Sequence, residues 1–132
     1  MKNHPYNENF LFVFGSNEAG IHGGGAAKWA KDNLGAQWGK GFGISGYTFA
    51  FPTKDRNIQT LSKEKIKEYF VEFFKIAREN PHIGFNLTPV GCGLAGYKKN
   101  DIFDVICEVD DLIEDMPQNI FFDARWFNFH GG

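Results

Sequence analysis

The sequence has few cysteines, no long apolar run and no excess of basic residues. Its two cysteines, Cys92 and Cys107, provide neither a CxxC pair nor a disulfide framework. No window approaches the roughly 18 to 20 apolar residues of a membrane helix, and the opening "MKNHPYNENF" lacks the core of a signal peptide. Lys and Arg number 14 against 16 Asp and Glu, so no basic stripe is available for a nucleic-acid backbone. We therefore expect a cytoplasmic protein without a membrane partner and without strong nucleic-acid backbone binding.

The sequence also shows no residue spacing that is typical of a metal site. His4, His82 and His130 are scattered without the spacing of a metal site. We expect neither a metal nor a cofactor.

Aromatic residues, by contrast, are abundant. They make up 17% of the chain, with 15 Phe, and so many rings must be buried in a core. A length of 132 residues is enough for a core of ordinary size. We expect one domain that spans residues 1–132.

Short apolar runs alternate with segments of helical periodicity. The apolar runs predict strands over 10–14, 47–52, 83–91 and 120–122. The periodic segments predict helices over 26–34, after an N-cap at Ser62, and over about 101–113. Such repeated strand–loop–helix units are typical of an α/β domain with a largely parallel sheet. Ligands of these sheets bind beyond the carboxyl ends of the strands, where glycine-rich loops over 15–25, 38–46 and 92–101 could converge.

The stretch "GIHGGGAAKWAKDNLGA" joins three glycines directly to a predicted helix. The first turn of a helix leaves backbone N–H groups unpaired, and glycines let a phosphate approach them without meeting a Cβ. A tight turn or close helix–strand packing is the alternative use of Gly23, Gly24 and Gly25. The loop matches neither a P-loop, since Lys28 is misplaced, nor a dinucleotide fingerprint, since its glycines are contiguous.

Three blocks, "HGGGAAKWAKDNLGA", "YTFAFPTKD" and "LTPVGCGLAGY", occur in an order that resembles the macrodomain fold. They look most like the lysine-dependent branch of ADP-ribosyl glycohydrolases, and they are also similar to small bacterial and phage proteins of macrodomain type. The resemblance implies a three-layer α/β/α sandwich with a mixed, mostly parallel sheet. It also implies ADP-ribose, or an ADP-ribosylated macromolecule, as the partner.

The resemblance assigns a role to each matching position. It implies that Asn17 lies near the distal ribose and that Lys54 is the catalytic nucleophile. The residues expected to bind the pyrophosphate are Gly23, Gly24, Gly25 and Ala26 in the first loop, and Gly91, Cys92, Gly93, Leu94 and Ala95 in the second, with Gly96 and Tyr97 at its rim.

The chemistry of Lys54 can also be reasoned independently. Ring-opened ADP-ribose exposes an aldehyde at C1″, which an unprotonated lysine amine can attack to give a Schiff base. The alternative is an exposed lysine that pairs with its neighbour Asp55. Some lysine-dependent relatives carry an acid where this chain has Ala95, so Asp55 or Asp101 would have to transfer the proton.

Other side chains are open to two interpretations. His22 is either an acid–base group or a loop side chain that hydrogen-bonds a backbone carbonyl. Cys92 is either a nucleophile or a small buried residue that allows close backbone approach. The 126–129 tail either covers the ligand or forms a core strand. The aromatic rings considered for an adenine slot are Phe12, Phe14, Phe51, Phe85, Trp126 and Phe127.

These observations leave three hypotheses for function. The first is a module that binds ADP-ribose or a related nucleotide and hydrolyses ADP-ribosyl linkages through Lys54. The second is a non-catalytic reader or sponge of an ADP-ribose-derived signal, and the third is a phosphatase-like nucleotide hydrolase that uses His22.

Overall fold

A computed structural model describes residues 3–127 of the chain. In these residues the strands are β1 (Phe10–Asn17), β2 (Gly43–Ser45), β3 (Thr48–Lys54), β4 (Gly84–Leu87) and β5 (Ile120–Phe122). The helices are α1 (Gly25–Leu34), α2 (Lys63–Glu79), α3 (Lys99–Ile113) and the 3-10 turn η1 (Ala124–Phe127). No helix of the described residues is long and apolar enough to cross a membrane.

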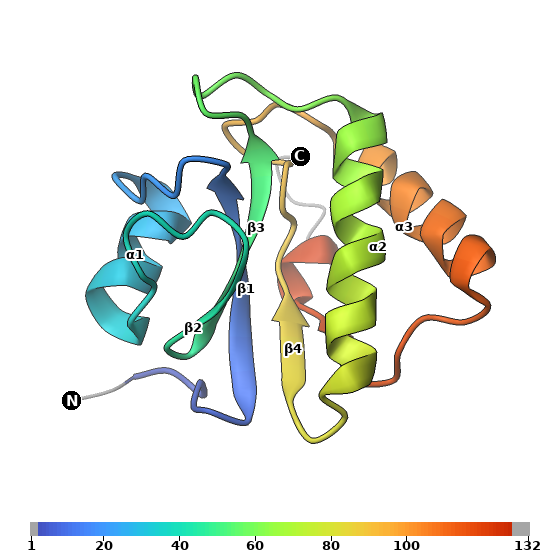
Figure 1. Cartoon of the computed structure of the whole chain (residues 1–132), viewed down its shortest axis with the longest axis horizontal. Coiled ribbons are helices and arrows are strands. Elements are labelled where there is room, and N and C mark those ends of the chain that lie inside the picture. Colours follow the sequence, from blue (N-terminus) through green and yellow to red (C-terminus); the bar gives the residue numbers. More distant parts are fainter. Residues whose placement is uncertain (1–2, 128–132) are drawn as a thin grey trace.

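The strands form one mixed sheet in the order β2-β3-β1-β4-β5. β1 pairs in parallel with β3 and β4, β4 pairs in parallel with β5, and only the short β2 runs antiparallel to its neighbour β3. Helix α1 covers one face of the sheet, and α2 and α3 cover the other (Figure 1). The predicted fold class, a three-layer α/β/α sandwich with a mostly parallel sheet, is confirmed.

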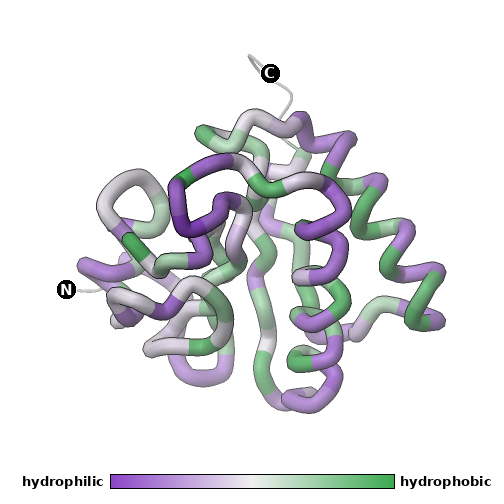
Figure 2. Tube along the Cα trace, turned by 45° about the horizontal axis from the view of Figure 1, so that its top comes forward, coloured by the Kyte–Doolittle hydropathy of each residue, from purple (hydrophilic) through white to green (hydrophobic). Residues whose placement is uncertain are grey.

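The aromatic residues fill a core on both faces of the sheet. The smaller cluster packs Phe12 and Phe14 against the alanines of α1, and the larger one packs the other face against α2 and α3. In α2 the side chain of Ser62 accepts a hydrogen bond from the Lys65 N–H at 3.2 Å, as expected of an N-cap. Hydrophobic and hydrophilic residues alternate along α2 and α3 on the right of Figure 2, because each helix buries one stripe.

Three element predictions need correction. β1 continues through the polar residues to Asn17, since its backbone still pairs with β3 across a register shift at Ser16. The second glycine-rich loop contains a strand, β2. β4 ends at Leu87 rather than near Gly91, because Pro89 has no N–H with which to continue a ladder.

Candidate functional site

A cavity of about 520 Å³ lies beyond the carboxyl ends of β1, β3 and β4. This is the place that a parallel sheet favours for a ligand. Its lining is drawn from four segments of the chain: Gly15, Ser16, Asn17, Ile21, Gly23, Gly24, Gly25, Ala26 and Ala27; Thr53, Lys54 and Ile58; Thr88, Pro89, Val90, Gly91, Gly93, Leu94 and Ala95; and Arg125.

The first glycine loop presents bare backbone to this cavity. A Cβ on Gly24 or Gly25 would meet no atom within 4 Å, and one on Gly23 would only touch Ile21 at 4.0 Å. Gly24 is the N-cap of α1, and no side chain caps the helix there. Lys28 is the first residue whose N–H bonds back to Gly24. Among residues 3–127, the first-turn N–H groups of α1 therefore have no acceptor, and the helix dipole makes that point electropositive.

Hydrogen bonds to two side chains fix the shape of the first loop. The amide of Asn17 both donates to the Ile21 carbonyl at 2.9 Å and accepts from the Ile21 N–H at 3.0 Å. The fully buried ring of His22 places Nε2 at 3.0 Å from the Gln37 carbonyl and 3.2 Å from the Lys40 carbonyl. Asn17 lines the cavity and also stabilises the loop, whereas His22 is not part of the lining and connects the loop to the segment 37–40.

The second glycine-rich loop, 38–46, does not line the cavity. It packs behind the first loop: the Gly39 N–H donates to the Gly20 carbonyl at 2.8 Å. The expected convergence of three glycine loops is therefore wrong in one respect, because two loops meet at the cavity and the other supports the first.

The third glycine loop faces the first across the cavity. Turn hydrogen bonds shape it, from the Gly96 N–H to the Gly93 carbonyl and from the Tyr97 N–H to the Gly91 carbonyl. Within the described part of the chain, the N–H groups of Gly93, Leu94 and Ala95 have no acceptor. The loop thus offers a second set of open amides.

Three predicted members of the third loop lie outside the cavity lining: Cys92, Gly96 and Tyr97. The Tyr97 hydroxyl donates to the Leu61 carbonyl at 2.7 Å, which anchors the end of the loop. The Cys92 side chain packs against the core, and burial raises the pKa of its thiol to about 11. The structure places Cys92 as a packing residue, the second of its two interpretations.

The charged residues of the lining are Lys54 and Arg125, and none of the described lining residues is an Asp or Glu. Lys54 forms no ion pair with another described residue, so the expected alternative of a Lys54–Asp55 pair is wrong. The Asp55 carboxylate instead accepts the N–H groups of Asn57 and Gln59 at 2.8 and 3.0 Å. Asp101 caps α3 and pairs with Lys63 at 3.4 Å, away from the cavity.

Arg125 is a lining residue that the sequence did not point to. It follows β5, and its guanidinium Nε lies 2.8 Å from the Asp123 carboxylate. The sheet order puts Lys54, the last residue of β3, at one end of the cavity and Arg125, after β5, at the other, with the two glycine loops between them. The site is therefore long, with Lys54 at one end, the Arg125–Asp123 ion pair at the other and amides in the middle.

The six aromatic candidates for an adenine slot are not in the lining. Phe12, Phe14, Phe51, Phe85 and Trp126 are core residues with at most 3% of their surface exposed. Trp126 belongs to η1 and its indole N–H donates to the Leu87 carbonyl, so this part of the 126–129 tail is core, in a 3-10 turn rather than a strand, whereas Phe127 is 57% exposed outside the cavity lining. Asn128 and Phe129, like His130, lie outside the described residues.

Within residues 3–127, no cluster of His, Cys, Asp and Glu could hold a metal ion.

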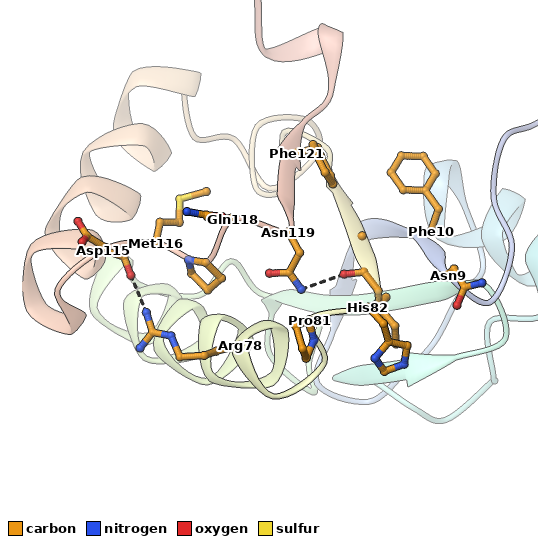
Figure 3. Close-up of a pocket in the computed structure, with 13 residues that line it drawn as sticks. Asn9, Phe10, Arg78, Pro81, His82, Asp115, Met116, Gln118, Asn119 and Phe121 are labelled. Carbon is orange, nitrogen blue, oxygen red and sulfur yellow. Dashed lines mark hydrogen bonds between the residues drawn. The ribbon is translucent and has the colours of Figure 1, made fainter.

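A larger hollow of about 1010 Å³ lies at the opposite end of the parallel strands, beside Phe10 and Gly84 (Figure 3). Two of its polar side chains are engaged with the protein itself. The side-chain N–H₂ group of Asn119 donates to three backbone carbonyls, and Arg78 donates to the Asp115 carbonyl at 2.6 Å. None of the predicted site residues lines it. We therefore place the candidate site at the smaller, amide-lined cavity.

One solved structure has a fold similar to that of this chain. No model of a protein family matches the sequence, and no curated protein matches it. Among solved structures, the macrodomain of Mycobacterium tuberculosis DarG superposes with a TM-score of 0.59 over 92% of this chain and 93% of that chain, at 14% sequence identity. The chain has a macrodomain-like fold.

Proposed function

We propose that the cavity binds ADP-ribose or a closely related nucleoside diphosphate. The observation that carries the proposal is the pair of glycine loops that face each other with open amides. Backbone N–H groups at a helix start and in a glycine loop are the groups that bind phosphate oxygens. Lys54 adds positive charge, Arg125 adds guanidinium N–H groups beyond those that pair with Asp123, and none of the described lining residues carries a carboxylate that would repel phosphate. The macrodomain-like fold and the elongated site support ADP-ribose as the ligand.

Isothermal titration with ADP-ribose tests this proposal, with AMP as the comparison because it lacks the diphosphate. We expect ADP-ribose to bind and AMP to bind at least about tenfold more weakly, since a lost charged hydrogen bond costs about 1.5 to 3 kcal/mol. A Lys75→Gln variant, which removes an exposed charge from α2, should bind as the parent protein does. If ADP-ribose does not bind at millimolar concentration, the nucleotide assignment fails and only the fold remains.

A second candidate function is hydrolysis of an ADP-ribosyl linkage with Lys54 as the nucleophile. It is supported by the position of Lys54 in the cavity, where residues 3–127 provide no ion-pair partner for it. The competing role, a non-catalytic reader or sponge, is supported by the lack of a carboxylate in the described lining that could move protons. The phosphatase-like alternative has less support, because the His22 ring is buried outside the cavity.

Lys54→Ala separates the two roles. For an enzyme, release of ADP-ribose from an ADP-ribosylated substrate should disappear in the variant while ADP-ribose binding stays within a few-fold. The Lys75→Gln variant serves as the charge-matched control and should retain turnover. Absence of turnover in the parent protein, with binding intact, would assign the reader role.

A further inference from the structure

Ile58 adopts a backbone conformation that a β-branched residue rarely takes. Its φ is +61°, in the left-handed region that glycine and asparagine favour. Strain of this kind persists only where the surrounding structure enforces it, and it collects at ligand-binding sites. Burial of the side chain does not explain why an isoleucine occupies this strained position, because 45% of Ile58 is exposed.

The turn around Ile58 is fixed by hydrogen bonds that do not involve its side chain. Lys54 and Thr60 form a β-bridge, and the N–H of Asp55 donates to the Gln59 carbonyl at 2.8 Å. The Asp55 carboxylate accepts two further N–H groups of the turn, as described above. The Thr60 hydroxyl donates to the Ala95 carbonyl at 2.9 Å, which ties the turn to the third glycine loop. The backbone thus holds Ile58 in place whatever its side chain contacts.

The side chain of Ile58 lines the cavity at the Lys54 end. Ile21 and Leu94, from the two glycine loops, are also large, exposed apolar residues of the lining. A soluble surface exposes single apolar residues commonly, but here three loops each bring one to the same cavity. Exposed apolar side chains gathered at one cavity are typical of a ligand contact.

We propose that Ile58 packs on the sugar beyond the diphosphate and selects ADP-ribose over ligands that end at the diphosphate. This inference rests on the proposed function, and on the candidate reaction in which Lys54 attacks C1″ and therefore lies beside the distal ribose. Ile58 belongs to the same turn as Lys54, whereas Arg125 marks the other end of the site. The C–H groups of a ribose ring provide an apolar face for such a contact. ADP, which lacks that sugar, would leave Ile58 exposed.

Two variants and two ligands test the proposal. Ile58→Asn and Ile58→Gly both accept a positive φ, so we expect each to raise the melting temperature by about 3 °C through relief of strain. We expect ADP-ribose to bind about tenfold more weakly to each variant, because the apolar contact is lost, while the Kd for ADP stays unchanged. Leu112→Gln, which replaces an exposed apolar residue of α3, should change neither affinity.

Each other outcome is informative. Unchanged ADP-ribose affinity in both variants would overturn the role of Ile58, and so would an equal loss for ADP-ribose and ADP, since that places the contact at the adenosine end. Failure of the parent protein to bind ADP-ribose would instead overturn the proposed function itself, so the two failures are distinguishable.

Discussion

Gly24 and Gly41 lie in neighbouring glycine-rich loops, and neither has the positive φ that would require glycine. A Cβ on Gly24 would meet nothing within 4 Å, whereas a Cβ on Gly41 would lie 2.3 Å from the Asn17 carbonyl oxygen. Gly24 faces the cavity, and Gly41 packs against the backbone that shapes the cavity. The same residue type therefore has opposite uses: one glycine keeps space open for a ligand, and the other lets two segments of the chain touch.

The same division applies to other glycines. Gly93 faces open space like Gly24, and Gly20 lies against the backbone of the neighbouring loop like Gly41, with a Cβ position 2.3 Å from Gly39. Loops of similar composition thus form a binding surface and its support. A small side chain should impair binding at the first kind of glycine and folding at the second.

The largest expected effect comes from Gly41→Ala. Its methyl group would overlap the Asn17 carbonyl, so we expect the free energy of unfolding to fall by about 3 kcal/mol, because the obstructing atom is backbone. Gly24→Ala is the matched control and should cost less than about 1 kcal/mol, the difference between glycine and alanine at an N-cap. Urea denaturation measures both. Equal losses would refute the division between the two glycines.

Gly24→Asp should separate binding from stability. Aspartate is a preferred N-cap in the extended conformation that Gly24 adopts, so we expect stability to be kept or raised. Its carboxylate would occupy the open amides and repel phosphate, and ADP-ribose binding should weaken more than about a hundredfold. Gly24→Asn, with the same shape and no charge, should show a smaller loss. Tight ADP-ribose binding by Gly24→Asp would place the phosphates elsewhere.

We expect the stability of the folded protein to depend on pH through His22, whose ring is buried beneath the first glycine loop. Burial lowers the pKa of His22 from its ordinary 6.5, and its buried Nδ1 has no partner within the described structure. The unfolded chain therefore takes up this proton at a higher pH than the folded chain does. Stability should be constant above about pH 6.5, the ordinary pKa of histidine, and should fall as the pH drops below it. Thermal melts between pH 5 and 8 measure this loss of stability. In His22→Gln the melting temperature should depend less on pH. An equally steep decline in that variant would assign the effect to another group.

The smallest effect concerns Cys92, which lies between Gly91 and Gly93 in the third glycine loop. With its thiol pKa raised to about 11, few Cys92 thiolates exist at pH 8, whereas Cys107 is exposed. Iodoacetamide should therefore label Cys107 much faster, as mass spectrometry of digested protein would measure. Cys107→Ser leaves Cys92 as the sole target and should be labelled slowly. Rapid labelling of that variant would mean that Cys92 faces solvent rather than the core.

Much of the fold could be predicted because its signals are local. The apolar periodicity of α2, its N-cap Ser62 and the left-handed stop at Gly35 after α1 all depend on residues close in sequence. Boundaries were less predictable where pairing with a distant strand decides them, as in the extension of β1 to Asn17. The two cavity-lining glycine loops and Lys54 could also be picked out from sequence. Arg125 could not, because its place depends on where β5 joins the sheet.

The sequence by itself determined that this chain forms a mostly parallel α/β sandwich, and that glycine-rich segments follow its strands. Those properties depend on hydrophobic periodicity and backbone preference, which are encoded within a few residues. Only the tertiary structure decided which glycines face a cavity, which aromatic rings are core and which charges share the site. Each of those outcomes depends on the distance between segments that are remote in sequence, and only the packing of the whole sheet sets that distance.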